Sequence, residues 1–111
     1  MTPARPDARA DRIIERVRAI PSGFVRTYGD IDPKAPRLVG RILAMHYVGD
    51  DPRGDRVPWH RVVRADGRVP RGEVQLALLR QEGVPLRNDR VDLRRARLPL
   101  NASAAHPRSA T

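Results

Sequence analysis

The sequence predicts a single mainly α-helical domain with short β-hairpins, of the winged helix-turn-helix type. Three observations predict this fold class. A chain of 111 residues is long enough for one modest hydrophobic core and too short for two. Stretches with helical periodicity are interleaved with short apolar segments that flank turn residues. The chain is also strongly basic, with 22 Lys+Arg against 13 Asp+Glu and a net charge of +9.

The first helix is predicted over residues 8–20. Its apolar side chains fall on one stripe, and they are Ile13, Ile14, Val17 and Ile20. Pro21 removes a backbone donor and Gly23 tolerates a positive φ, so the helix is expected to stop there. The next stretch, "FVRTYGDI", is expected to be a short extended segment that ends in a turn at Gly29 and Asp30.

A second helix is predicted in "PRLVGRILAMHY", because Pro36 suits a first helical turn. At about 100° per residue, one face carries Leu38, Val39, Ile42, Leu43 and His46. The other face carries Arg37, Gly40, Arg41 and Ala44. Small residues on that outer face would let the helix backbone approach a polyanion closely while the two arginines reach past it.

Two extended segments, "RVPWHRVV" and "GRVP", are predicted on either side of a tight turn at Asp66-Gly67. A further amphipathic helix is predicted over residues 73–82, with Val74 and Leu78 facing inward and Gly83 ending it.

The stretch "VPLRNDRVDL" is expected to form a small hairpin that turns at Asn88-Asp89. Residues 1–7 and 101–111 are rich in Pro, Ala and Ser and are expected to be disordered tails, which leaves a domain over residues 8–100.

The positive charge is almost wholly guanidinium, since Lys34 is the only lysine. A GC-rich codon bias would also enrich arginine. Whatever its origin, such a surface attracts polyanions, so nucleic acid is the favoured partner. The N-terminal residues contain no apolar signal segment and no stretch approaches the ~20 apolar residues of a membrane span. A cytoplasmic, nucleoid-associated protein without membrane contact is therefore expected.

Few residues in the chain could support catalysis. The absence of cysteine removes disulfides, thiolate metal sites and any thiol nucleophile. Lys34 stands alone in a proline-flanked loop, and the histidines show no metal-binding spacing. No glycine-rich phosphate loop is present. These observations favour a binding protein, and they predict neither a metal nor a cofactor.

Five motifs, in order, resemble those of the O6-alkylguanine-DNA alkyltransferases over residues 13–98. "PWHRV" resembles the Pro-Cys-His-Arg-Val active-site signature, with Trp59 in the place of the cysteine. That replacement is the mark of the alkyltransferase-like proteins. "IPSGFVRTYGDI" resembles the family's Ile-Pro-x-Gly-x-Val-x-Thr-Tyr-Gly-x-Ile stretch, and "RLVGRIL" resembles its Arg-x-Val-Gly recognition helix. The motifs "RADGRV" and "LLRQEGV" then follow in the family's order.

The resemblance implies a DNA-binding face. Members of the family bind the minor groove with a helix-turn-helix and rotate the damaged base into a pocket. Arg37 matches the arginine that fills the vacated space in the duplex, and Tyr28 matches the tyrosine that presses on the phosphate 3′ to the target. Gly40, Arg41 and Ala44 would lie against the groove, where an ordinary phosphate contact is the expected role of Arg41.

The resemblance also implies a lesion pocket. Trp59 would line it, although a lone tryptophan in a small domain is more often a core residue. His60 and Glu82 match the pair that activates the cysteine in the enzymes, and without a thiol they are expected to persist as a hydrogen-bonded structural pair. Arg61 would hold nearby carbonyls, and Arg71 would lie over the alkylated base or, equally, elsewhere.

The function implied is non-enzymatic recognition of O6-alkylguanine in duplex DNA by a monomer that flags the lesion for nucleotide excision repair proteins. The alternative is a winged-helix DNA-binding or regulatory protein without lesion specificity. The chain departs from the family between Tyr28 and Arg37, which stand closer together than usual. "DPKAP" replaces most of the first helix of the helix-turn-helix and is expected to leave at best a brief turn.

Overall fold

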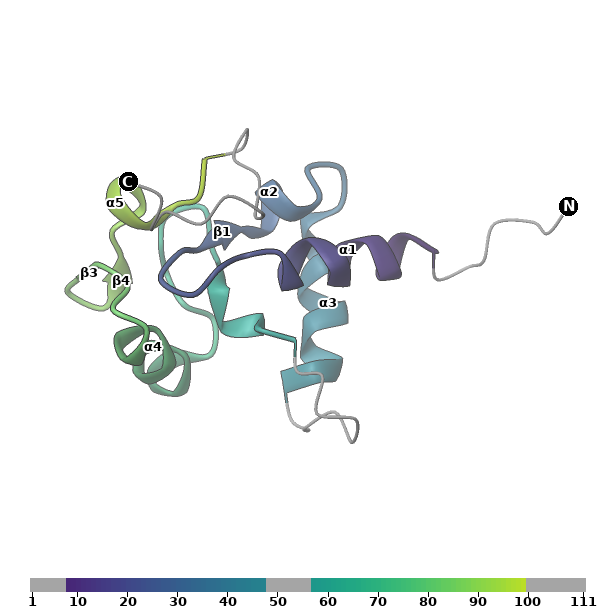
Figure 1. Cartoon of the computed structure of the whole chain (residues 1–111). Helices are drawn as coiled ribbons and strands as arrows, with labels where there is room; N and C mark the ends of the chain where they lie inside the picture. The colour runs from purple at the N-terminus through teal and green to yellow at the C-terminus, as the bar shows by residue number, and fades with distance from the viewer. Residues whose placement is uncertain (1–7, 48–56, 100–111) are drawn as a thin grey trace, which may run out of the picture.

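The computed structural model describes residues 8–47 and 57–99, in which short helices surround two small sheets (Figure 1). The elements, in chain order, are α1 (Ala8–Arg18), β1 (Arg26–Thr27), α2 (Tyr28–Ile31), α3 (Pro36–Tyr47), a 3-10 turn (Trp59–Arg61), β2 (Val62–Val63), α4 (Gly72–Gln81), β3 (Leu86–Arg87), β4 (Arg90–Val91) and α5 (Leu93–Ala96). This mainly helical arrangement is consistent with the predicted winged helix-turn-helix class. The expected tails lie outside the described residues, so the domain limits at 8 and 100 stay a prediction.

The predicted inner faces of α1 and α3 are confirmed. The buried side chains of the two helices are Ile13, Val17, Val39, Ile42 and Leu43. They pack with Ile20 and other residues into the first hydrophobic cluster, while Ile14 and Leu38 are partly buried at its edge. The outward Arg37 and Arg41 of α3 are exposed, as predicted. The side chain of His46 lies outside the described residues.

The turn expected at Gly29-Asp30 is instead the one-turn helix α2, which begins at Tyr28. Thr27 caps it: its side-chain oxygen accepts from the Asp30 backbone N–H at 3.1 Å, and the Asp30 carboxylate accepts from the Thr27 N–H at 3.0 Å. This reciprocal capping box satisfies two backbone donors that a bare turn would leave to water. The first helix of the helix-turn-helix, expected to be at best a brief turn, is therefore this single turn before "DPKAP", and Tyr28 belongs to it.

The extended segment predicted from "RVPWHRVV" is confirmed only at Val62–Val63. Residues 59–61 form a 3-10 turn, and β2 pairs in parallel with β1, with Arg26 opposite Val62 and Thr27 opposite Val63. The two valines are completely buried, Val62 in the first cluster and Val63 in a second. A strand covered on both faces is typical of parallel pairing, because neither face is left for water. The turn at Asp66-Gly67 is confirmed, with Gly67 at φ +86°.

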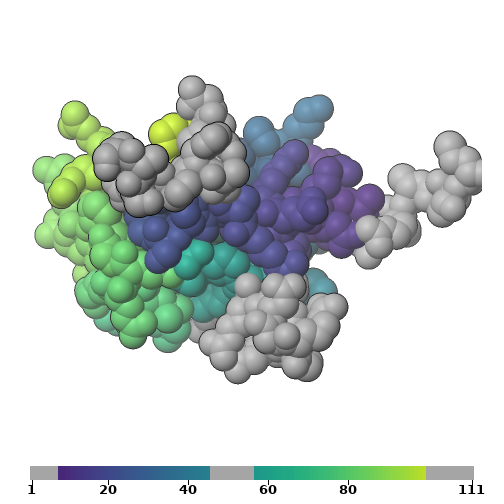
Figure 2. Space-filling view, in the orientation of Figure 1, coloured from purple at the N-terminus to yellow at the C-terminus, as the bar shows by residue number. Residues whose placement is uncertain are grey.

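The second hydrophobic cluster lies at the C-terminal end of the molecule and contains Val25, Val63, Leu79, Val84, Val91 and Ala96. On the face shown in Figure 2, the purple residues of α1 lie toward one end, the green residues of α4 and the segments after it at the other, and teal residues between them. The strand pair β1–β2 therefore lies between the two clusters. None of the helices in residues 8–47 and 57–99 combines the length and apolar character that crossing a membrane requires.

The hairpin turning at Asn88-Asp89 is confirmed: β3 and β4 are antiparallel, and Asn88 adopts φ +57°. Gly83 follows α4 at φ +75°, also as predicted. The inner face predicted for α4 is wrong, since Val74 is 53% exposed and Leu78 only partly buried. Gln75, Leu76 and Leu79 are buried instead. The helix can turn this face inward because the Gln75 amide is fully hydrogen-bonded there, as described below.

Candidate functional site

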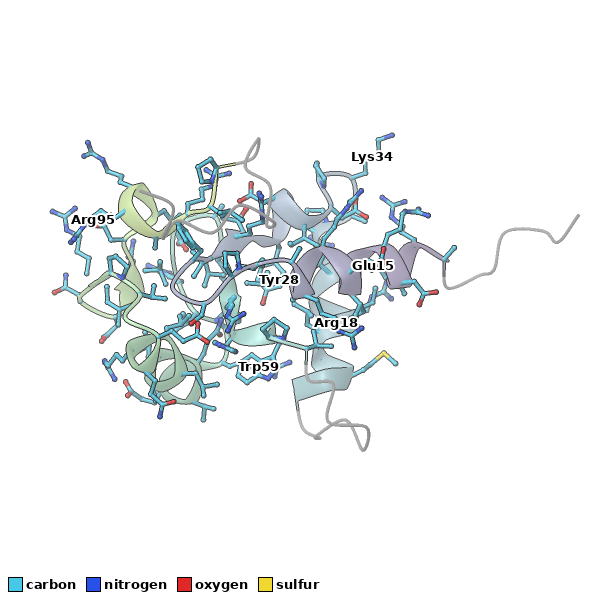
Figure 3. The ribbon with its side chains drawn as sticks, in the orientation of Figure 1. Glu15, Arg18, Tyr28, Lys34, Trp59 and Arg95 are labelled. Atoms are coloured by element: carbon cyan, nitrogen blue, oxygen red, sulfur yellow. The ribbon has the colours of Figure 1, made fainter. Side chains whose placement is uncertain are left out.

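Trp59 opens the 3-10 turn that leads into β2. The turn is held by backbone bonds from the Trp59 N–H to the Val57 carbonyl at 2.8 Å and from the Arg61 N–H to the Pro58 carbonyl at 3.1 Å. The indole is half-buried and packs on the edge of the first cluster. Its ring stands edge-on to the imidazole of His60, with centroids 5.9 Å apart and an interplanar angle of 85°. Figure 3 shows Trp59 beside this turn, between α3 and α4.

His60, Arg61 and Glu82 form a hydrogen-bonded group, here called the Glu82 network. His60 Nε2 lies 2.8 Å from Glu82 Oε2, which confirms the expected pair. Arg61 donates to the same carboxylate through Nη2 at 2.7 Å and through Nε at 3.0 Å, and its Nη1 donates to the Ile20 carbonyl at 2.8 Å. The hydrogen bond from Arg61 to a backbone carbonyl was expected from the resemblance, whereas its hydrogen bonds to Glu82 were not. The network therefore ties the Trp59 turn to the end of α4 and to the end of the first helical segment.

Glu82 is held in its ionised form. Burial alone would raise the pKa of this carboxyl, but the hydrogen bonds from Arg61 and then His60 outweigh it and leave the pKa below its usual value. The three side chains are largely shielded, with exposed fractions of 14% for His60, 19% for Arg61 and 16% for Glu82. A carboxylate held by a guanidinium in this way is a rigid structural support for the residues around it.

Gln75 is a site residue that the sequence analysis missed. It is only 1% exposed, and its Nε2 donates to the carbonyls of His60 at 3.0 Å and Val62 at 2.9 Å. Its Oε1 accepts from the backbone N–H of Arg71 at 3.1 Å. One amide thus joins the start of α4 to the Trp59 turn. The sequence signal for its burial was spacing: Leu76 and Leu79 follow Gln75 by one and four positions, which places the three on one face of a helix.

Tyr28 lies against the outer face of α3. A Cβ added to Gly40 would be 3.8 Å from Tyr28 Cε1, so the tyrosine ring covers the helix at the point where the side chain is missing. Burial raises the pKa of the Tyr28 hydroxyl, and the positive charges of Arg71 and Arg64 act in the opposite direction without cancelling the rise. The hydroxyl therefore stays a neutral hydrogen-bond donor at physiological pH.

The predicted site residues come together as two adjoining groups. His60, Arg61 and Glu82 form one network below Trp59, and Arg71 is joined to the same turn through Gln75. Tyr28 and Gly40 form the second group, with Arg37, Arg41 and Ala44 further along the same face of α3. The described residues contain no group of three or more His, Cys, Asp or Glu side chains that could hold a metal ion.

Comparison with known proteins finds relatives that all belong to one family of DNA-binding proteins. Residues 8–84 match the family described as "6-O-methylguanine DNA methyltransferase, DNA binding domain". The chain is 36% identical over 103 residues to a DNA base-flipping protein of Escherichia coli (strain K12), covering 84% of this chain and 76% of that protein. It is 48% identical over 62 residues to a methylated-DNA–protein-cysteine methyltransferase of Methanopyrus kandleri, over 50% of this chain and 40% of that one.

The fold matches a solved structure of S. pombe Atl1 in complex with damaged DNA containing O6-carboxymethylguanine. The TM-score is 0.65 at 26% sequence identity, and the match covers 86% of this chain and all of the other. A second S. pombe ATL structure, in complex with DNA, matches over the same shares with a TM-score of 0.67.

Proposed function

This chain belongs to the family of 6-O-methylguanine DNA methyltransferase DNA-binding domains, and from that premise we propose that it recognises O6-alkylguanine in duplex DNA without removing the alkyl group. The damaged base would be turned out of the helix and held against Trp59. The names of two relatives support this proposal: one is a DNA base-flipping protein, and the other was solved with DNA carrying an O6-alkylated guanine.

The observation that carries the proposal is Trp59 standing beside an intact Glu82 network. The position that resembles the enzymes' cysteine holds an indole, whose nitrogen lone pair belongs to the aromatic ring and does not attack carbon. The chain contains no cysteine elsewhere to replace it. His60, Arg61 and Glu82 nevertheless keep their hydrogen bonds, so the turn keeps its shape while the nucleophile is gone. Such a site is suited to holding a base and offers no acceptor for an alkyl group.

The outer face of α3 suits the minor groove. Gly40 and Ala44 allow close approach, and Arg37 and Arg41 are exposed beside them on the same face. Arg37 would enter the duplex and fill the space left by the base, and Arg41 would contact phosphate. Arg71, joined to the Trp59 turn through Gln75, would lie beside the extruded nucleotide. Extruding a base costs a few kcal/mol, and less where a lesion has already weakened pairing. Stacking on Trp59 and the groove contacts would supply that free energy.

In the cell, the bound protein would mark the lesion and would not repair it. A monomer bound to an extruded base and a bent duplex would present a bulky distortion to nucleotide excision repair proteins. It would act at the nucleoid, where its substrate is.

The decisive measurement is the dissociation constant for a duplex containing one O6-methylguanine and for the same duplex with guanine, at matched salt. We expect tighter binding to the lesion, with the preference lost in Trp59→Ala and reduced in Arg37→Ala. Arg95→Ala, on α5 at the far end of the molecule (Figure 3), is the charge-matched control for Arg37→Ala and should keep the preference. Equal affinity of the wild-type protein for both duplexes would instead favour a winged-helix DNA-binding protein without lesion specificity.

A second measurement tests the absence of chemistry. Incubation with a duplex carrying a radiolabelled O6-methyl group should leave the protein unlabelled after denaturation. Stable label on the chain would show transfer and would overturn the non-enzymatic part of the proposal.

A further inference from the structure

We propose that Tyr28, Arg64 and Arg71 together form a binding site for one DNA backbone phosphate beside the extruded nucleotide, with Arg64 as its principal cation. This inference rests on the proposed function and adds to it a residue, Arg64, that neither the resemblance nor the sequence pattern assigns. The three residues come from three different elements, and they are named the phosphate site below.

The register of the parallel strands brings Arg64 to Tyr28. Thr27 is opposite Val63 in the β1–β2 pair, so the residues that follow the two strands, Tyr28 and Arg64, leave the sheet side by side. Parallel strands point their carboxyl ends to the same edge, which is where ligand-binding side chains gather in such sheets. Arg64 is exposed, and its backbone is fixed by bonds from the Gly67 N–H to its carbonyl at 2.8 Å and from its own N–H to the Arg68 carbonyl at 3.0 Å.

Tyr28 offers a positioned hydroxyl. Its ring is held on one side by Gly40 of α3, and its backbone starts a capped helix. No hydrogen bond engages the hydroxyl within the described part of the chain, and no buried side-chain oxygen there lacks a partner. Among the described residues, the hydroxyl is therefore left to donate to a ligand. Burial of the ring raises its pKa, which keeps the proton available for donation to an anion.

The strand register brings the backbone of Arg64 beside Tyr28, and the positive charges of Arg64 and Arg71 both act to lower the pKa of the tyrosine against the effect of burial. The backbone of Arg71 is fixed by its bond to the buried Gln75 amide. Across residues 8–47 and 57–99, no carboxylate forms an ion pair with Arg64. An exposed guanidinium without a carboxylate partner among the described residues, beside a neutral hydroxyl donor, suits a phosphate diester.

The neighbours of the site agree with a phosphate rather than a base. Gly40 places the phosphate site against the outer face of α3, the helix proposed to enter the groove. Gln75 places it against the turn that carries Trp59. A phosphate bound between these two elements would belong to the stretch of backbone that has to rotate when the base moves toward Trp59.

The salt dependence of binding tests Arg64. We expect Arg64→Ala to bind both damaged and undamaged duplexes about fivefold to tenfold more weakly. It should also reduce the slope of log K against log salt by about 0.9, the value for one phosphate contact. Arg64→Lys should keep the slope, because it keeps the charge. Arg95→Ala removes the same charge from an exposed position on α5 and should change neither quantity comparably.

Neutral linkages locate the phosphate. In a series of lesion duplexes, each with one methylphosphonate near the lesion, neutralisation at a single position adjoining the lesion should weaken the wild type but not Arg64→Ala. The phosphate site is refuted if Arg64→Ala has the same affinity and salt slope as Arg95→Ala. It is also refuted if every methylphosphonate weakens the binding of Arg64→Ala as much as it weakens the binding of the wild type. That result is distinct from failure of the proposed function, which would appear as a wild-type protein with no preference for the lesion duplex.

Discussion

The Oε2 atom of Glu82 accepts hydrogen bonds from two successive residues, His60 at 2.8 Å and Arg61 at 2.7 Å. One carboxylate at the end of α4 thus fixes two neighbouring side chains of the turn that begins with Trp59. The shape of the proposed pocket therefore depends on a charge located outside the turn itself.

Replacing Glu82 by glutamine should expose this dependence. The Glu82→Gln variant keeps the volume but leaves Arg61 without its anionic partner, and loss of a charged, shielded hydrogen bond costs about 2 kcal/mol. Urea unfolding should show this loss. Glu73→Gln is the matched control on the same helix, because Glu73 is 79% exposed and lies 3.8 Å from Arg80. Its cost should be below about 0.5 kcal/mol, and equal costs for the two variants would contradict a supporting role of Glu82.

Gln75 should matter to both stability and recognition. In Gln75→Leu the carbonyls of His60 and Val62 and the N–H of Arg71 lose their partner, and the unpaired groups should cost about 1–3 kcal/mol. Arg71 should also lose its fixed position. The ratio of affinities for O6-methylguanine and undamaged duplexes is then expected to fall, measured under conditions where the variant is folded. Gln81→Leu, exposed at the end of α4, should leave stability and ratio unchanged.

Gly40 should show opposite effects on stability and on binding. A Cβ at this position would be 3.8 Å from the Tyr28 ring, an ordinary contact, so Gly40→Ala should fold normally. Its helix should gain up to about 1 kcal/mol from the higher propensity of alanine. DNA affinity should nevertheless decrease, because the added methyl group stands on the face proposed to meet the groove. Thermal unfolding and duplex binding measured together would reveal this, and unchanged affinity would place the groove elsewhere.

The ion pair between Arg9 and Asp32 predicts a stability change in acid. Arg9 donates to the two carboxylate oxygens at 2.7 and 2.8 Å, and chiefly through these bonds the pKa of Asp32 falls from 3.8 to about 2. Since the folded state has the lower pKa, the stabilisation is complete above about pH 4. It is lost as the pH falls from there toward 2.

The measurement for this pair is urea unfolding of the wild type and Asp32→Asn at pH 7 and at pH 2.5. The wild type should be the more stable at pH 7, and the difference should shrink at pH 2.5. Asp89→Asn, in the exposed loop of the β3–β4 hairpin, is the control. A difference that stays constant over this range would show that the carboxylate charge of Asp32 contributes nothing.

Local patterns predicted local structure well. Helix α3 begins at Pro36 and ends at Tyr47, as expected, because one strongly amphipathic stretch with a proline in its first turn contains all the necessary information. The hairpin at Asn88-Asp89 was equally predictable, since asparagine readily adopts the positive φ that the turn requires. The pair of His60 and Glu82 came from the family resemblance, not from spacing.

Contacts between distant segments were not predictable in the same way. The pairing of β1 with β2 joins residues 36 positions apart, Arg26 and Val62, and nothing in "VV" distinguishes a parallel partner from an antiparallel one. Gln75 was missed because its burial depends on carbonyls of the Trp59 turn that no helical pattern contains. The placement of the Arg64 backbone beside Tyr28 likewise depends on the register of that strand pair.

The two adjacent valines of β2 belong to different interiors, Val62 to the N-terminal one and Val63 to the C-terminal one. Each of the two core clusters therefore takes one side chain from the same dipeptide. A fragment cut just before this dipeptide, or just after it, would retain apolar surface that it has no means of covering. The chain should consequently lose its structure as one cooperative unit, with amide protons at the dipeptide the last to exchange with solvent.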